Sequence, residues 1–179
     1  AVDDHQRGLA RRRHPPHVEL RIVGQHGADA GQHGVGAPAP GVAVRARLGI
    51  PADGPHVAFF GFVHPVKGLR YLIEAVAKLR SRHPRLHLLL LGGFTSRALP
   101  APEAAAFREE LVDRAAGCGV VDRVTITGHL PAAEVSAALH AADVAAFPFT
   151  AGATTKSGAL LSAFAHGLPT LVTEADPPD

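Results

Sequence analysis

From about residue 45 onward, the sequence alternates short apolar runs that end at glycine or proline with longer segments of helical periodicity. The apolar runs have the length of buried strands and cover 56–61, 86–91, 124–127, 143–147 and 170–173. The helical segments between them begin near 69, 102, 132 and 156. Because parallel neighbouring strands need helical crossovers, this alternation predicts an α/β fold built on a doubly wound parallel sheet.

Residues 1–44 differ from the rest of the chain in composition. They hold five of the twelve His and seven of the nineteen Gly, with one short apolar segment at 18–23 that can form a strand. No helical period holds over this stretch, so it is interpreted as an irregular extension or remnant. The folded domain is therefore expected at 45–179, truncated at its C-terminus because no final helix follows the last strand.

Composition and charge exclude several classes of function. The net charge of +2 comes partly from one arginine run at 11–13, and there is no basic stripe interleaved with aromatic residues, so no nucleic-acid partner is expected. No apolar run is long enough for a membrane span, and the histidines lack metal-ligand spacing. The single cysteine, Cys118, excludes an internal disulfide and favours a reducing, cytoplasmic location.

The first candidate binding segment is the loop 61–68, which leaves a strand and enters a helix. Ligands of open parallel sheets bind at the carboxyl ends of the strands, where such loops lie. Lys67 can place an ammonium group beside a phosphate, and Gly68 lets the backbone come close. The alternative is a solvated lysine at a helix start, where its charge opposes the helix dipole.

The second candidate segment is the loop 150–158, with the sequence TAGATTKSG. Its backbone donors around Ala153 to Ser157, its hydroxyl groups and the charge of Lys156 suit a diphosphate at the start of a helix. The spacing of the nucleoside-triphosphatase phosphate loop is absent, which excludes that class. Capping of the helix by Thr154 or Thr155 is expected as well, and it can coexist with binding.

A third loop, 128–131, ends a strand at the same edge of the predicted sheet. Its His129 can meet a base or a sugar, although a single exposed histidine is more often a bystander. His166 precedes Gly167 at a helix C-terminus, where favourable interaction with the helix dipole is the simpler explanation.

Four stretches together carry a resemblance to a known family: FFGFVHPVKGLRYLIEAVAKL, LHLLLLGG, DRVTITGHLPAAEVSAALHAADVAAFPF and SGALLSAFAHGLPTLVT. In this order, from about Arg45 to Thr173, they resemble the C-terminal domain of the retaining glycosyltransferases of GT-B fold known as glycosyl transferase group 1. The resemblance implies a Rossmann-like lobe that holds a nucleotide-diphosphate sugar opposite a separate N-terminal acceptor lobe. No cofactor beyond that substrate is implied.

The chemistry of the three loops and the resemblance together give a set of candidate donor-binding residues. They are Gly61, Lys67, Gly68, Gly93, His129, Ala153, Thr154, Thr155, Lys156, Ser157 and Ser162. The family's lysine that binds donor phosphate falls on Lys67. The family's arginine in the same loop falls on Phe62, and its pair of glutamates falls on Thr154 and Ser162. Recognition of ribose and sugar is therefore rebuilt or weaker, with Lys156 as a substitute for the arginine.

The resemblance favours a hexosyltransferase half that binds its donor but, without its N-terminal lobe, does not catalyse transfer to its acceptor, which remains unidentified. No base or nucleophile in this chain is needed, so no catalytic residue is assigned. Two alternatives stay open. One is a non-catalytic binding module, favoured by the lost arginine and glutamates. The other is a nucleotide-sugar epimerase of the same architecture, for which only His64, His129 and His166 are available at the rim.

Overall fold

The computed structural model describes residues 20–23, 40–154 and 156–174. Their centre is a six-stranded sheet of order β1-β6-β5-β2-β3-β4. The strands are β1 (Leu20–Val23), β2 (His56–Phe60), β3 (His87–Leu91), β4 (Val124–Gly128), β5 (Val144–Phe147) and β6 (Thr170–Thr173). Strands β2 to β6 are parallel, as the alternation in the sequence predicts, while β1 pairs antiparallel with β6 at one edge.

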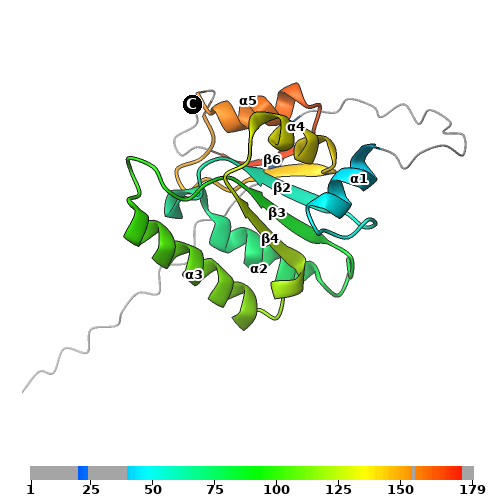
Figure 1. Cartoon of the computed structure of the whole chain (residues 1–179), viewed down its shortest axis with the longest axis horizontal. Helices are drawn as coiled ribbons and strands as arrows, with labels where there is room; N and C mark the ends of the chain where they lie inside the picture. The colour runs from blue at the N-terminus through cyan, green and yellow to red at the C-terminus, as the bar shows by residue number, and fades with distance from the viewer. Residues whose placement is uncertain (1–19, 24–39, 155, 175–179) are drawn as a thin grey trace, which may run out of the picture.

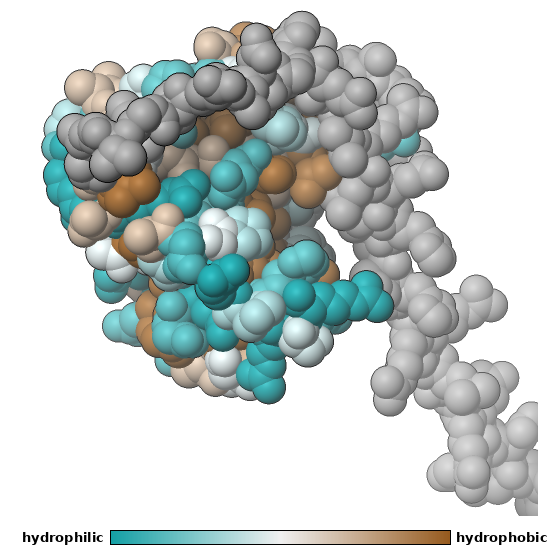
Figure 2. Space-filling model, turned by 90° about the vertical axis from the view of Figure 1, so that its right-hand side faces the viewer, coloured by the Kyte–Doolittle hydropathy of each residue, from teal (hydrophilic) through white to brown (hydrophobic). Residues whose placement is uncertain are grey.

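Helices cover both faces of the sheet, which confirms the doubly wound α/β architecture. The α-helices are α1 (Pro40–Arg47), α2 (Leu69–Leu79), α3 (Ala101–Gly117), α4 (Ala132–His140) and α5 (Gly158–Ala165), and the short 3-10 helices are η1 (Pro65–Lys67) and η2 (Val121–Arg123). Helices α2 and α3 lie on one face of the sheet, and α1, α4 and α5 lie on the other (Figure 1). Over its coloured part, the side on which α1 lies mixes hydrophilic and hydrophobic residues without a large continuous hydrophobic area (Figure 2).

Helix α1 is an element that the sequence pattern does not indicate. It begins at Pro40, so the last residues of the stretch 1–44 are helical. Tertiary contacts hold it: the Arg45 guanidinium donates to the Ala141 carbonyl at 2.9 Å and pairs with Asp143 at 3.4 Å. The helix is therefore fixed by its docking against the end of α4 rather than by apolar periodicity.

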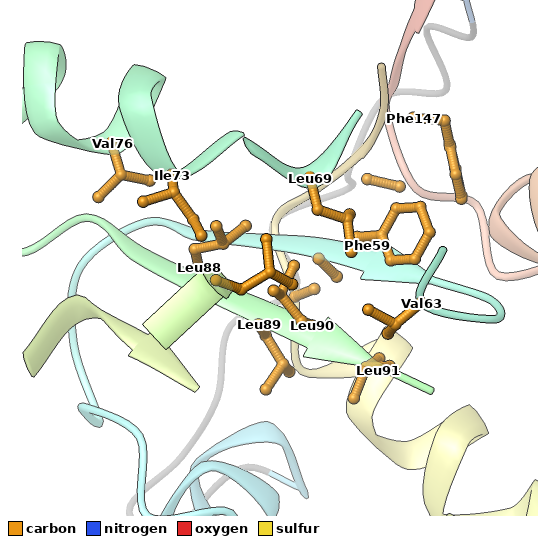
Figure 3. Close-up of a cluster of buried hydrophobic side chains, with 14 of the residues drawn as sticks. Phe59, Val63, Leu69, Ile73, Val76, Leu88, Leu89, Leu90, Leu91 and Phe147 are labelled. Carbon is orange, nitrogen blue, oxygen red and sulfur yellow. The ribbon is translucent and has the colours of Figure 1, made fainter. Parts of the chain in front are cut away.

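The core lies on both faces of the sheet, against α2 and α3 on one side and against α4 and α5 on the other. All of β3 is buried, as expected for a strand covered on both faces. The α2 side chains Leu69, Ile73 and Val76 pack over this strand (Figure 3). The Phe59 and Phe147 rings, from β2 and β5, lie 5.8 Å apart between their centroids. These contacts fix the two central strands on which the candidate site is built.

The connections of the sheet reverse direction between β2 and β5. The chain passes from β2 through α2 to β3 on one side, and from β5 through α5 to β6 on the other. The carboxyl ends of these two neighbouring strands therefore open a crevice, the usual ligand site of doubly wound sheets. The loops that leave them, 61–68 and 148–157, contain or overlap the two segments, 61–68 and 150–158, that the sequence analysis selects.

Candidate functional site

A cavity of about 1020 Å³ lies at the carboxyl ends of the parallel strands. Its walls come from the loops after β2, β3, β4 and β5 and from the sides of α4 and α5. Most of its wall is apolar, with Phe59, Phe62, Leu130, Val135 and Phe149 among the lining residues. An apolar cavity with a few polar groups at the strand ends is the usual form of a small-molecule site.

Direct bonds hold the two central loops together. Thr150 donates its backbone N–H to the Val66 carbonyl at 3.0 Å and its hydroxyl to the same oxygen at 3.1 Å. These bonds place Lys67 and the loop before α5 on one cavity, since both line it. Lys67 thus lies on the same cavity as the loop before α5, and not at the opposite edge of the sheet.

Lys67 is the last residue of η1, and its position is set locally and by packing. The His64 Nδ1 accepts the Val66 N–H at 3.3 Å and so caps this short helix. The Lys67 ammonium lies 4.3 Å from the centre of the Phe149 ring. The ring face attracts a cation without neutralising it. None of the ion pairs among the described residues involves Lys67 or Lys156.

The predicted glycines divide into two groups. Gly61 and Gly93 line the cavity, and Gly93 stands beside His129, which also lines it. Gly68 does not line it; it is buried against β5's end, where an added Cβ would lie 1.8 Å from the Pro148 oxygen. The close approach at Gly68 is therefore one of backbone to backbone, and it brings Lys67 next to the loop after β5.

The loop before α5 contributes Thr154, Lys156 and Ser157 to the cavity wall. Ala153 lies outside the wall, and its N–H donates to the Thr173 carbonyl at 2.9 Å, while the Ser157 N–H donates to the Thr154 carbonyl at 3.1 Å. Two of the amides expected to face a diphosphate are thus bonded within the protein. Thr155 lies outside the described residues.

Helix α5 begins later than the sequence indicates, and this changes its cap. The N-cap is Ser157, whose Oγ accepts the Leu160 N–H at 3.3 Å, so the expected cap at Thr154 is wrong. Because Ser157 has extended backbone geometry at the boundary, it satisfies a free amide that a threonine three residues earlier cannot reach. The start of α5 still faces the cavity through Ser157 and Gly158.

One polar cluster in the wall was not found from the sequence. His166, after the end of α5, has its Nδ1 2.7 Å from the Ser162 carbonyl and its Nε2 2.8 Å from the Ser136 Oγ of α4. The His140 ring packs against it with centroids 4.8 Å apart. Ser136 carries no local signal, because only the packing of α4 on α5 brings it to His166.

The described residues offer neither a metal site nor a membrane span. No group of three or more His, Cys, Asp or Glu among them is arranged to hold a metal ion. None of their helices has the length and apolar content needed to cross a bilayer.

Fold and site together define an α/β domain with a ligand cavity at the switch point of a parallel sheet. The chain belongs to the family described as glycosyl transferases group 1, whose model matches residues 54–179. This confirms the resemblance seen in the four sequence stretches.

Curated relatives of this chain share its sequence over part of their length. The D-inositol 3-phosphate glycosyltransferase of Kineococcus radiotolerans is 36% identical over 117 residues, which cover 63% of this chain and 26% of the relative. The enzyme of the same name from Nocardia farcinica is 34% identical over 113 residues, 62% of this chain and 24% of the relative. The chain thus spans about a quarter of the length of the curated relatives it matches.

Solved structures of glycosyltransferases share the fold. Anabaena HepE, solved in complex with UDP and glucose, has a TM-score of 0.59 and 25% identity, over 75% of this chain and 33% of HepE. The sucrose-phosphate synthase of Thermosynechococcus elongatus has a TM-score of 0.54 and 31% identity, over 71% of this chain and 29% of the synthase. The C-terminal domain of LpcC from Francisella tularensis, 22% identical with a TM-score of 0.55, covers 72% of this chain and 62% of that domain, and it shows the fold alone.

Proposed function

We propose that this chain binds a nucleotide-diphosphate sugar and serves as the donor-binding half of a glycosyltransferase that transfers a hexose to an acceptor. The observation that carries the proposal is the shared cavity of Lys67, Lys156 and the start of α5. Two ammonium groups and a helix N-terminus at one wall suit the two charges of a diphosphate ester. HepE, which has the same fold, was solved with UDP and glucose.

The chemistry asked of these residues is positioning and charge stabilisation. Transfer breaks the bond between the sugar and the diphosphate, so negative charge develops on the leaving diphosphate. In this proposal Lys67, Lys156 and the first amides of α5 stabilise that charge, which needs no base or nucleophile from this chain. We propose that the acceptor is held by another lobe and that transfer takes place in the cytoplasm.

The binding proposal is tested by thermal unfolding with UDP, GDP, ADP and TDP. A ligand at 100 times its dissociation constant stabilises the folded state by about 2.7 kcal/mol. For a chain of this size, we expect the midpoint to rise by roughly 5–10 °C. The absence of a shift with all four diphosphates would contradict the proposal.

The phosphate role is tested with Lys67→Ala and the matched control Lys78→Ala. Lys78 is exposed on α2 and does not line the cavity. Loss of one charge-assisted bond is expected to weaken diphosphate binding about 10- to 100-fold, with little effect on the nucleoside. Titration calorimetry measures both, and equal losses for diphosphate and nucleoside would contradict the phosphate role.

A non-catalytic binding module is the second candidate, and one observation favours it. No carboxylate is present among the described residues that line the cavity. A chain that binds diphosphates but transfers no sugar when supplied with a complete acceptor lobe supports this reading. No such observation favours the epimerase alternative: His64 does not line the cavity, and His166, which lines it together with His129, is hydrogen-bonded to Ser136 and to the Ser162 carbonyl.

A further inference from the structure

The polar groups of the cavity wall are unusually restricted in type. Among the described lining residues there is no Asp, Glu, Asn or Gln. The charged groups are the two lysines, Lys67 and Lys156, and the remaining polar side chains are hydroxyls and histidines. The described part of the wall therefore offers charge for an anion but no side-chain carboxylate or side-chain amide to accept hydrogen bonds from a sugar.

Three of the hydroxyl groups in this wall are already engaged. Ser136 is bonded to His166 at 2.8 Å, and the Ser157 oxygen accepts the amide of Leu160 at 3.3 Å. Ser162 donates its hydrogen to the Gly158 carbonyl at 2.9 Å. Each of these hydroxyls therefore has part of its hydrogen-bonding capacity committed inside the protein: Ser162, for example, can accept from a sugar hydroxyl but cannot donate to one without breaking its bond to Gly158.

The polar side chains that remain are exposed. Thr154 and His129 both line the cavity, and neither side chain makes a hydrogen bond to another described side chain. A group that is free to move discriminates weakly, because it follows the ligand instead of imposing one geometry.

Hexose epimers differ only in the direction of one hydroxyl group. A site rejects the wrong isomer strongly when fixed polar groups are left unpaired by it, with factors of about 10⁴ to 10⁵ in favourable cases, whereas apolar walls discriminate far less. Phe59, Phe62 and Phe149 are apolar parts of this wall, so they discriminate little between epimers.

The diphosphate is recognised by different groups. Both lysines and the start of α5 act on charge that a nucleoside diphosphate and its sugar ester share. Adding the sugar removes one negative charge from the terminal phosphate and adds hydroxyl groups for which this wall has few fixed partners.

We propose that this cavity recognises the nucleoside diphosphate and does not distinguish hexose epimers, so that the free diphosphate binds about as tightly as its sugar esters. The inference rests on the proposed donor-binding function and narrows it. The donors are nucleotide hexoses, and the site accepts more than one hexose epimer. The diphosphate released after transfer competes effectively with the donor for the same cavity.

The test is calorimetric titration of the whole 179-residue chain with two ligand series. One series is UDP, UDP-glucose and UDP-galactose, and the other is GDP, GDP-glucose and GDP-mannose. Within the series whose base binds, the three dissociation constants are expected to agree within about tenfold, the net effect of one neutral hydrogen bond.

Lys156→Ala gives a second, independent readout. It is expected to weaken all three ligands of the series by the same factor, because all three share the diphosphate. Lys78→Ala, on the exposed side of α2, is expected to leave them unchanged.

The outcomes separate the inference from the function on which it rests. A sugar ester that binds more than tenfold tighter than its epimer, or than the free diphosphate, overturns the inference while the donor-binding proposal stands. Loss of affinity in Lys156→Ala for the sugar esters alone overturns it too. Absence of binding by every ligand in both series overturns the inference, and the proposed function falls with it only if ADP and TDP also fail to shift the unfolding midpoint.

Discussion

At the scale of single residues, Gly68 shows how one missing side chain builds the site. Its φ of +70° lies in the left-handed region, and its Cα faces the Pro148 carbonyl so closely that a Cβ has no space. This close approach, together with the Thr150–Val66 hydrogen bonds, lets the loops after β2 and β5 meet. A residue selected as a phosphate contact thus acts through the packing that positions Lys67.

Replacing Gly68 by Ala is expected to destabilise the chain by about 3 kcal/mol or more. The left-handed conformation costs a non-glycine residue about 1–2 kcal/mol, and the overlap with Pro148 forces a further backbone shift. Gly49→Ala is the matched control, because Gly49 has a φ of +65° but nothing within 4 Å of its Cβ position. Urea unfolding of both variants measures the difference, and equal losses would show that the close approach is unimportant.

Phe62 and Ser162 are two cavity positions at which the residue type departs from the family pattern. Both line the cavity, at positions where the resemblance places an arginine and a glutamate. Phe62 is 59% exposed, so an aromatic ring stands at the rim where a charge was expected from the family pattern. The resemblance shows that the arginine and the glutamate are missing at these two positions. Only the structure shows that no carboxylate from elsewhere in the chain replaces the glutamate among the described residues of the wall.

At the scale of elements, the amino ends of β2 and β3 bury two histidines side by side. The His56 and His87 rings lie 6.0 Å apart between centroids, and the His87 Nε2 is 2.8 Å from the Thr125 Oγ1 of β4. Burial lowers the pKa of His87 to about 4, with a contribution from His56, and burial also lowers the pKa of His56. Both rings are therefore neutral in the folded chain at neutral pH.

This pair predicts acid sensitivity with a defined sign. In the unfolded chain His87 binds a proton below about pH 6.5, whereas in the folded chain it binds one only below about pH 4. The free energy of unfolding therefore falls as the pH drops through this window. At pH 5 the loss from His87 is on the order of 2 kcal/mol. His87→Leu is expected to reduce the difference in urea midpoint between pH 7 and pH 5, whereas exposed His83→Leu leaves it unchanged. A wild-type midpoint that is constant over this range would contradict the prediction.

Ion pairs join helices α2 and α3, and the sequence pattern of neither helix predicts them. Arg70 pairs with Glu110 at 2.5 Å, and Arg114 with Glu74 at 2.5 Å. The Arg70 guanidinium lowers the pKa of the Glu110 carboxyl, mainly through its hydrogen bond. Because these groups are partly exposed, such pairs contribute little to the free energy of unfolding. Their main effect is to fix how the two helices lie together.

At the scale of the whole molecule, the order of the strands sets where stability and function lie. Strands β2, β3 and β5 occupy the middle of the sheet, whereas β4 and β1 form its edges. The cavity opens at the ends of the central strands, so loops that must admit a ligand are anchored to the most buried part of the fold.

We expect native-state hydrogen exchange to follow this arrangement. Amides of β3 and β2 should exchange most slowly, because both strands are paired on two sides and largely buried, and β4, which is only half-buried, should exchange faster. Mass spectrometry of exchanged peptides measures this order. Slower exchange in β4 than in β3 would contradict it.

The sequence by itself determined the strand and helix alternation, the parallel sheet and the two loops of the site, because these depend on local periodicity and on turn residues. The tertiary structure alone decided that α1 is a helix, that β1 completes the sheet, that Ser157 caps α5, and that His166 meets Ser136. Each of these depends on partners distant in the chain, as Arg45 does on Asp143, and pairing over such distances leaves no periodic trace in the sequence.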